Sequence, residues 1–140
     1  MIYLDTSVLG AIFYKEANAA QVMGQIETVH SEGLVISAWT LAEMASVGSL
    51  KERMGVIDRT TRRAALSAFQ RFASSSLALT EIEPADFRSA ALLIDGPAPL
   101  RAGDALHLAV IKRLPSALAT LDRRLADAAR HWGVTLLPLR

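Results

Sequence analysis

The chain opens with Met1-Ile2-Tyr3-Leu4-Asp5-Thr6-Ser7-Val8-Leu9, an apolar stretch that runs directly into an acidic residue. The segment of residues 1–4 is short and apolar, as in a buried strand, and residues 6–14 carry apolar side chains at helical spacing. A buried carboxylate is unfavourable unless something compensates its charge. The opening therefore predicts a strand followed by a helix, with the acidic residue Asp5 at the junction.

The rest of the chain alternates between the same two kinds of segment. We expect helices at residues 18–31, 37–53, 84–94, 103–113 and 122–132 and one that starts at Thr60 or Thr61, with strands at 34–36, 77–82, 117–121 and 134–137. Short strands that alternate with helices imply a mostly parallel sheet covered on both faces. The predicted fold class is therefore α/β, with a central sheet of about five strands flanked by helices.

The composition limits the class of protein. With 140 residues, of which 51% are hydrophobic, the chain suits a single domain with a full core, which we expect to span residues 1–140. Cysteine is absent, so disulfides and thiolate metal sites are excluded. The N-terminus lacks the basic segment of a secretory signal, and no apolar run approaches the roughly 20 residues that cross a bilayer. We therefore expect a soluble, cytoplasmic protein that does not contact membranes.

Four acidic residues lie beside or inside apolar stretches: Asp5, Glu43, Asp104 and Asp122. Ligands bind at the carboxyl ends of the strands in parallel sheets, and Asp5 and Asp122 each follow a predicted strand directly. We therefore expect these two residues to be neighbours, although more than 110 residues separate them in the chain. Setting the four acids aside leaves ten acidic residues against 15 basic ones, a balance that suits an anionic substrate.

Each acid also has a purely structural interpretation. Asp5 and Asp122 precede helices, where Asp is a favoured N-cap, and Asp104 lies at a helix start, where the macrodipole favours negative charge. Glu43 differs, because it is expected in the middle of a helix and has no Lys or Arg three or four positions away. Capping does not exclude metal binding, since one carboxylate oxygen can cap a helix while the other binds an ion.

The stretches around these acids resemble the PIN-domain ribonucleases and, within that family, the VapC-type toxins of prokaryotic toxin–antitoxin pairs. The matching stretches are Ile2-Tyr3-Leu4-Asp5-Thr6-Ser7-Val8-Leu9, Ala42-Glu43, Arg101-Ala102-Gly103-Asp104-Ala105-Leu106-His107-Leu108-Ala109 and Thr120-Leu121-Asp122-Arg123-Arg124-Leu125. They occur in the order and spacing of the family, and no acidic position is lost. Residues 51–82 carry no family signature.

The resemblance implies a PIN-like three-layer fold and an acidic pocket that binds Mg²⁺ or Mn²⁺ and hydrolyses RNA phosphodiester bonds. Asp5, Glu43 and Asp104 would be ligands, directly or through water, and Asp122 would bind a second ion or orient the attacking water. Hard divalent cations prefer oxygen ligands, and a metal pair stabilises both the attacking and leaving oxygens at phosphorus. The resemblance also implies an antitoxin partner and a homodimer. The alternative is a non-catalytic RNA-binding or protein-interaction module that keeps the fold.

Six further residues near the acids are predicted to contact substrate or to hydrogen-bond the ligands: Thr6, Ser7, Arg101, His107, Thr120 and Arg123. The hydroxyl residues have local helix capping as their alternative role, and the arginines are otherwise solvated surface charges. His107 lies one helical turn after Asp104, where it donates to a carboxylate, contacts phosphate or is a satisfied, semi-buried histidine.

Two other families with acidic pockets fit the sequence poorly. A haloacid-dehalogenase-like phosphotransferase needs a second Asp two positions after the first, and that position is Ser7. A response-regulator receiver needs a Lys after a late strand, and the last lysine, Lys112, falls on a predicted helix before the final two strands.

Overall fold

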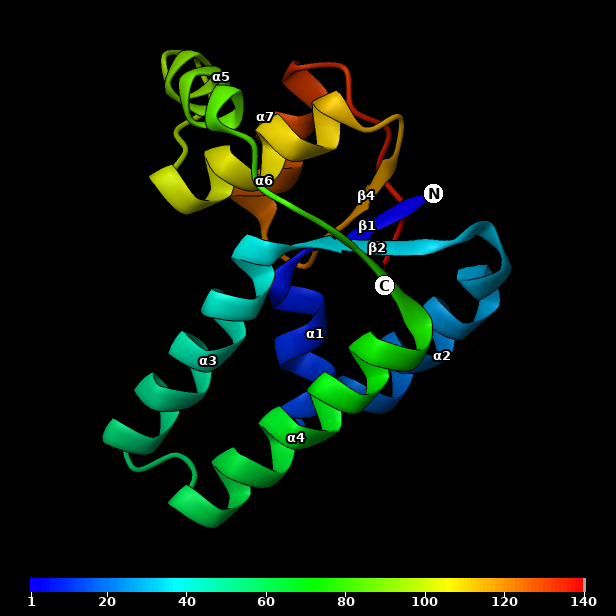
Figure 1. Cartoon of the computed structure of the whole chain (residues 1–140), viewed down its shortest axis with the longest axis vertical. Coiled ribbons are helices and arrows are strands. Elements are labelled where there is room, and N and C mark those ends of the chain that lie inside the picture. The colour runs from blue at the N-terminus through cyan, green and yellow to red at the C-terminus, as the bar shows by residue number, and fades with distance from the viewer. Residues whose placement is uncertain (140) are drawn as a thin grey trace.

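The computed structural model describes residues 1–139, and its centre is a parallel sheet of short strands (Figure 1). The strands are β1 (Ile2–Leu4), β2 (Leu34–Ser37), β3 (Leu77–Thr80) and β4 (Ala117–Ala119), in the spatial order β3-β2-β1-β4. Each neighbouring pair is parallel. The predicted α/β class is confirmed, and the sheet has four strands within the described residues where about five were expected.

Helices connect the strands and cover both faces of the sheet. They are α1 (Thr6–Phe13), α2 (Ala19–Val29), α3 (Ala38–Arg53), α4 (Arg59–Ser76), α5 (Pro84–Ile94), α6 (Ala102–Arg113) and α7 (Arg123–His131), with a 3₁₀ turn at His30–Glu32. Figure 1 shows α1 to α4 on one side of the sheet and α5, α6 and α7 on the other. This is the three-layer arrangement that the resemblance implied.

The core divides into two clusters because successive side chains of a strand point to opposite faces. Tyr3, Val35 and Leu118 face the layer of α5, α6 and α7, where the buried residues of α6 complete one cluster. Leu4 and Ile36 face the opposite layer and belong to the second cluster with residues of α1 to α4. All five of these side chains are at most 1% exposed, so the sheet is covered on both faces.

The fifth predicted strand, residues 134–137, forms only one bridge to the sheet. Leu118 pairs with Leu136, its N–H donates to the carbonyl of Thr135, and the N–H of Leu137 donates to the carbonyl of Leu118. β4, the strand that this segment would pair with, is only three residues long. Pro138, which lacks an N–H to donate, follows directly after residue 137. The segment therefore covers the edge of the sheet without extending it as a regular strand.

The remaining differences from the predicted boundaries are small. The helix expected to reach Ser31 ends at Val29 and continues as the 3₁₀ turn, and the strands expected to reach residues 82 and 121 end at Thr80 and Ala119. None of the described helices is long and apolar enough to span a membrane.

Candidate active site

Two of the four acids lie at the same edge of the sheet, past the carboxyl ends of the neighbouring strands β1 and β4. Leu4 of β1 pairs with Ala119 of β4, so the residues that follow, Asp5 and Thr120, are brought together. The Asp5 N–H donates to the carbonyl of Ala119 at 3.0 Å, which extends the pairing beyond the strands. Asp122 follows two residues later, and the structure thus brings Asp5 and Asp122 to the same rim, as predicted.

Both aspartates cap helices with one of their two carboxylate oxygens. Asp5 Oδ2 accepts from the backbone N–H of Ser7 at the start of α1. Asp122 Oδ1 accepts from the N–H groups of Arg124 and Leu125 at the start of α7. The described residues provide no hydrogen bond to the other oxygens, Asp5 Oδ1 and Asp122 Oδ2. The capping interpretation and a ligand role are therefore compatible in both residues.

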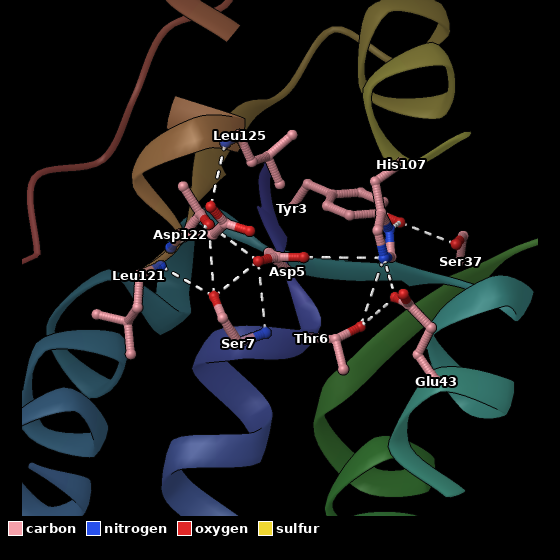
Figure 2. A network of polar contacts seen from close by, with 11 residues as sticks. Tyr3, Asp5, Thr6, Ser7, Ser37, Glu43, His107, Leu121, Asp122 and Leu125 are labelled. Carbon is pink, nitrogen blue, oxygen red and sulfur yellow. Dashed lines mark hydrogen bonds and ion pairs between the residues drawn. The ribbon is translucent and has the colours of Figure 1, made fainter. Parts of the chain in front are cut away.

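Hydroxyl groups hold the Asp5 carboxylate in place (Figure 2). Ser7 Oγ donates to Asp5 Oδ2 at 2.6 Å, and Thr120 Oγ1 donates to the same oxygen at 2.9 Å. Both hydroxyls are themselves fixed by backbone donors, since Leu121 N–H reaches Ser7 Oγ at 2.9 Å and Asp122 N–H reaches Thr120 Oγ1 at 3.0 Å. Asp5 is 4% exposed and therefore has little freedom to reorient.

Glu43 enters the site from the middle of α3 and meets His107 of α6. His107 Nε2 bonds to Glu43 Oε1, and Thr6 Oγ1 donates to the same oxygen at 2.7 Å. Nε2 also lies 3.8 Å from Asp5 Oδ1. His107 therefore lies between carboxylates that come from α3 and from the end of β1 (Figure 2). Glu43 has no Lys or Arg three or four positions away on α3, and its partner lies on α6 instead.

The other ring nitrogen of His107 is bound inside the core. Tyr3 Oη lies 2.6 Å from His107 Nδ1 and donates its proton to Ser37 Oγ at 2.8 Å. Because this proton points to Ser37, Nδ1 is the donor to Tyr3, and Nε2, which faces Glu43, is a second donor. Both ring nitrogens then carry protons. Burial lowers the pKa of His107, but the bond to Glu43 and the charges of Asp5 and Glu43 outweigh it, so that the pKa is raised.

The shifts in the pKa values of the acids show how unevenly their charge is compensated. Burial opposes ionisation of Glu43, but its bond to His107, the charge of His107 and the bond to Thr6 lower its pKa overall. The pKa of Asp104, at the start of α6, is raised to about 6, first by burial and then by the negative charges of Asp122, Asp5 and Glu43. Asp104 therefore lies in the field of the other three acids, and the described residues give its carboxylate no hydrogen bond.

The donor chemistry of this rim fits a hard divalent cation. All four acids offer carboxylate oxygen, Asp5 and Asp122 each keep one oxygen without a hydrogen bond, and the negative charge at Asp104 is offset only in part, by His107. Within residues 1–139, however, no three Asp, Glu or His side chains stand close enough together to hold one ion as placed. Mg²⁺ usually keeps several of its waters, so it binds through few direct carboxylates.

The six supporting residues divide into two groups. The hydroxyls of Thr6, Ser7 and Thr120 bind the acidic side chains, as set out above. Arg101 and Arg123 stand at the N-terminal ends of α6 and α7, and both are exposed and form no ion pair within residues 1–139.

His107 requires a correction. Its side chain is 0% exposed and both of its ring nitrogens are bound by protein groups, so it does not contact a substrate from this position. Of the roles considered for it, donation to a carboxylate and that of a satisfied histidine both match the structure, although the ring is fully buried.

Tyr3 and Ser37 belong to the network of the site, and the sequence analysis did not single them out. One available signal was position, because Ser37 ends β2 at the same edge of the sheet at which Asp5 follows β1. The other was chemistry, because a tyrosine within a buried strand needs a partner for its hydroxyl. The identity of that partner depends on tertiary packing, since His107 is 104 residues away.

The sequence pattern of the PIN domain family matches residues 2–131. A comparison with curated proteins finds no match. Among solved structures, the chain is similar to VapBC2 from Rickettsia felis, bound to a DNA fragment from their promoter (16% identity, 100% of both chains, TM-score 0.74). It is also similar to Mycobacterium tuberculosis VapC20, a sarcin-ricin loop cleaving toxin (18% identity, 98% of both chains, TM-score 0.72). A third similar structure is FitAcB from Neisseria gonorrhoeae (18% identity, 99% of this chain and 97% of that one, TM-score 0.71).

Proposed function

Because this chain belongs to the PIN domain family, we propose that it is a metal-dependent endoribonuclease and the toxin of a toxin–antitoxin pair. The observation that carries the proposal is the set of acids at the carboxyl edge of the sheet. Asp104 has a pKa raised to about 6 because burial and the charges of Asp122, Asp5 and Glu43 act on it together. A fold without a ligand for this rim gains nothing from such mutual repulsion, whereas a divalent cation relieves it.

Asp5, Glu43, Asp104 and Asp122 would hold Mg²⁺ or Mn²⁺, directly or through water. The ion supplies an activated water and stabilises negative charge on the phosphate oxygens. Ser7 and Thr120 fix the Asp5 carboxylate so that its free oxygen Oδ1 faces the site. Thr6 and His107 do the same for Glu43 through Oε1.

The substrate we propose is RNA. Arg101 and Arg123 are exposed beside Asp104 and Asp122, without ion-pair partners among the described residues, and are placed to bind phosphates of the backbone. VapC20, one of the structures with the same fold, is described as a sarcin-ricin loop cleaving toxin, which makes structured RNA the first substrate to test.

An antitoxin is the partner that we propose. The similar structure from Rickettsia felis is a VapBC2 complex on promoter DNA, and FitAcB is a second similar structure. To test this, we would look for a short reading frame beside the gene and purify its product. That product should inhibit RNA cleavage by this chain. On the same analogy we propose that residues 1–140 form one domain and that the protein is cytoplasmic. We also propose that it is a homodimer, which sedimentation of the purified chain would test.

The nuclease proposal is tested by RNA cleavage with the full chain, purified free of any partner. We expect cleavage with Mg²⁺ or Mn²⁺, and none with EDTA or in Asp5→Asn. Asp127→Asn is the matched control, because Asp127 is an exposed aspartate of α7 whose partner is Arg130, outside the acidic site. Cleavage that persists in EDTA or in Asp5→Asn rejects the mechanism. A wild type that binds RNA without cleaving it under any of these conditions favours the non-catalytic alternative.

A further inference from the structure

A chain of buried polar side chains runs from the core to the acidic site. It begins at Ser37, continues through Tyr3 and His107, and ends on the carboxylate of Glu43. Ser37, Tyr3 and His107 are each 0% exposed. Figure 2 shows these three side chains beside Glu43 and Asp5.

The hydrogen bonds of this chain have a defined direction. Tyr3 has one hydroxyl proton, which it donates to Ser37, so its oxygen is left to accept from His107 Nδ1. The ring of His107 also packs edge-on against that of Tyr3, with 5.6 Å between the ring centroids and an interplanar angle of 72°. One edge-on ring contact and one hydrogen bond thus fix both the position and the rotation of the imidazole.

The fixed imidazole in turn determines where Glu43 stands relative to Asp5. Its Nε2 bonds to Glu43 Oε1 and lies 3.8 Å from Asp5 Oδ1, while Thr6 Oγ1 lies 3.4 Å away. Asp5 is held independently by Ser7 and Thr120. Glu43 is therefore tied to the end of β1 by two described contacts, His107, which also approaches Asp5, and the hydroxyl of Thr6. A purely structural hydrogen-bond chain in the core has no need to end on a carboxylate of the site.

We propose that Tyr3 and Ser37 are positioning residues that act through His107 to hold Glu43 beside Asp5 in the geometry that binds the divalent ion. This inference rests on the proposed function, because it concerns the same ion. Groups behind the ligands of a metal site orient those ligands, and their loss typically lowers metal affinity or activity about 10–100-fold.

The chain contains a matched control for the loss of the Tyr3 hydroxyl. Tyr14 is also buried, at 7% exposure, and its hydroxyl donates to the carbonyl of Met44 at 2.7 Å. None of its described hydrogen bonds involves an acid of the site. Tyr3→Phe and Tyr14→Phe therefore remove the same group from similar surroundings, and only the first breaks the chain to Glu43.

The experiment titrates Mn²⁺ into the full chain and follows the free ion by electron paramagnetic resonance. We expect Tyr3→Phe to weaken Mn²⁺ binding about tenfold or more, whereas Tyr14→Phe binds like the wild type. Ser37→Ala should weaken it less, because His107 Nδ1 keeps the Tyr3 oxygen as its acceptor.

In metal-free protein, the nitrogen NMR signals of the His107 ring should shift in Tyr3→Phe and stay unchanged in Tyr14→Phe. With RNA, Tyr3→Phe should lower kcat and leave KM unchanged.

The outcomes separate this inference from the proposed function. A wild type that binds Mn²⁺ and a Tyr3→Phe variant that binds it equally well overturn the positioning role alone. Equal losses of Mn²⁺ affinity in Tyr3→Phe and Tyr14→Phe also overturn it, because they indicate a general effect on the fold. A wild type that binds no Mn²⁺ overturns the proposed function and this inference together. If Tyr3→Phe does not fold, Ser37→Ala with unchanged Mn²⁺ affinity and ring signals rejects the role.

Discussion

An acidic side chain lies at each end of α6, Asp86 of α5 at one end and Asp104 at the other, and their charges are compensated to different degrees. At the C-terminal end, Arg113 donates to both oxygens of Asp86, through Nε at 2.9 Å and Nη2 at 2.8 Å, and Asp86 also accepts the N–H of Glu83. The bond from Arg113 is the main reason why the pKa of Asp86 is lowered. At the N-terminal end, Asp104 has no such partner, and its pKa is raised to about 6, first by burial.

The difference supports the proposal that Asp104 binds a ligand, whereas Asp86 serves the fold. Asp86 is 2% exposed, yet its charge is balanced within the protein by a bidentate guanidinium contact. Asp104 is more accessible, but the charges nearest to it are Asp122, Asp5 and Glu43, all of the same sign, and His107 offsets them only in part. Burial alone therefore does not separate the two acids, whereas the balance of the charges around them does.

The largest expected effect comes from neutralising each of these two acids. Asp104→Asn should lower RNA cleavage at least about 100-fold, because it removes a ligand of the ion, and should leave stability in EDTA undiminished. Asp86→Asn should keep its cleavage rate and lose about 1–3 kcal/mol of stability, because its bonds to Arg113 weaken. Cleavage assays and urea unfolding of both variants measure this. Similar profiles in the two variants would show that the ends of α6 do not differ in role.

The acidic site could be predicted from the sequence only in part. The four acids were recognised by their apolar surroundings and by the family resemblance. That Asp5 and Asp122 lie at the same rim follows from strands that end shortly before each of them. Asp86 was not distinguished, because an acid in the first turn after Pro84 resembles an ordinary capping residue, and indeed it completes a capping box with Glu83. Its partner Arg113 lies 27 residues away, and such a pairing depends on how α5 packs on α6.

The same limit applies to the acidic site and to the edge of the sheet. That Glu43 needed a partner was visible in the sequence, but that the partner is His107 depends on the packing of α3 against α6. The segment 134–137 has the apolar character of a strand, and only its single-residue pairing with Leu118 shows that it does not continue the sheet.

A second effect is a difference in the sign of the pH dependence, measured in EDTA. The raised pKa of Asp104 makes its contribution to stability complete below the unfolded value of 3.8 and lost as the pH rises through about 6. The lowered pKa of Asp86 has the opposite effect, since its contribution is present above 3.8 and is lost as the pH falls further.

Thermal unfolding across this pH range, with Asp104→Asn and Asp86→Asn, separates the two contributions. Raising the pH through about 6 should cost the wild type about 1–3 kcal/mol relative to Asp104→Asn, and added Mg²⁺ should reduce this loss. Parallel pH curves for wild type and Asp104→Asn would mean that the charge of Asp104 is compensated after all.

The smallest effect concerns space at the start of α6. A Cβ on Gly103 would lie 3.2 Å from Trp39 Nε1 and 3.3 Å from Glu43 Oε2. The indole N–H of Trp39 helps to lower the pKa of Glu43. It is not placed to form a hydrogen bond with Glu43, however, and Nε1 has no hydrogen-bond partner within residues 1–139. Gly103→Ala should therefore displace Glu43 and reduce cleavage.

Gly24→Ala is the control for this substitution, because nothing lies within 4 Å of the added Cβ. Gly24 is in the interior of α2, so the change to Ala should raise stability by about 0.5–1 kcal/mol and leave cleavage unchanged. A Gly103→Ala variant that gains stability as Gly24→Ala does, with full cleavage, would show that the contact with Glu43 is not tight.

The proposed function depends on one arrangement, in which Asp5, Glu43, Asp104 and Asp122 share a divalent ion at the carboxyl edge of the sheet. A crystal of the full chain grown with Mn²⁺ and measured at the manganese absorption edge locates that ion directly. We predict anomalous density among these four carboxylates, with Asp86 and Arg113 still paired at the other end of α6. Density elsewhere on the protein, or none at a saturating Mn²⁺ concentration, would contradict the account.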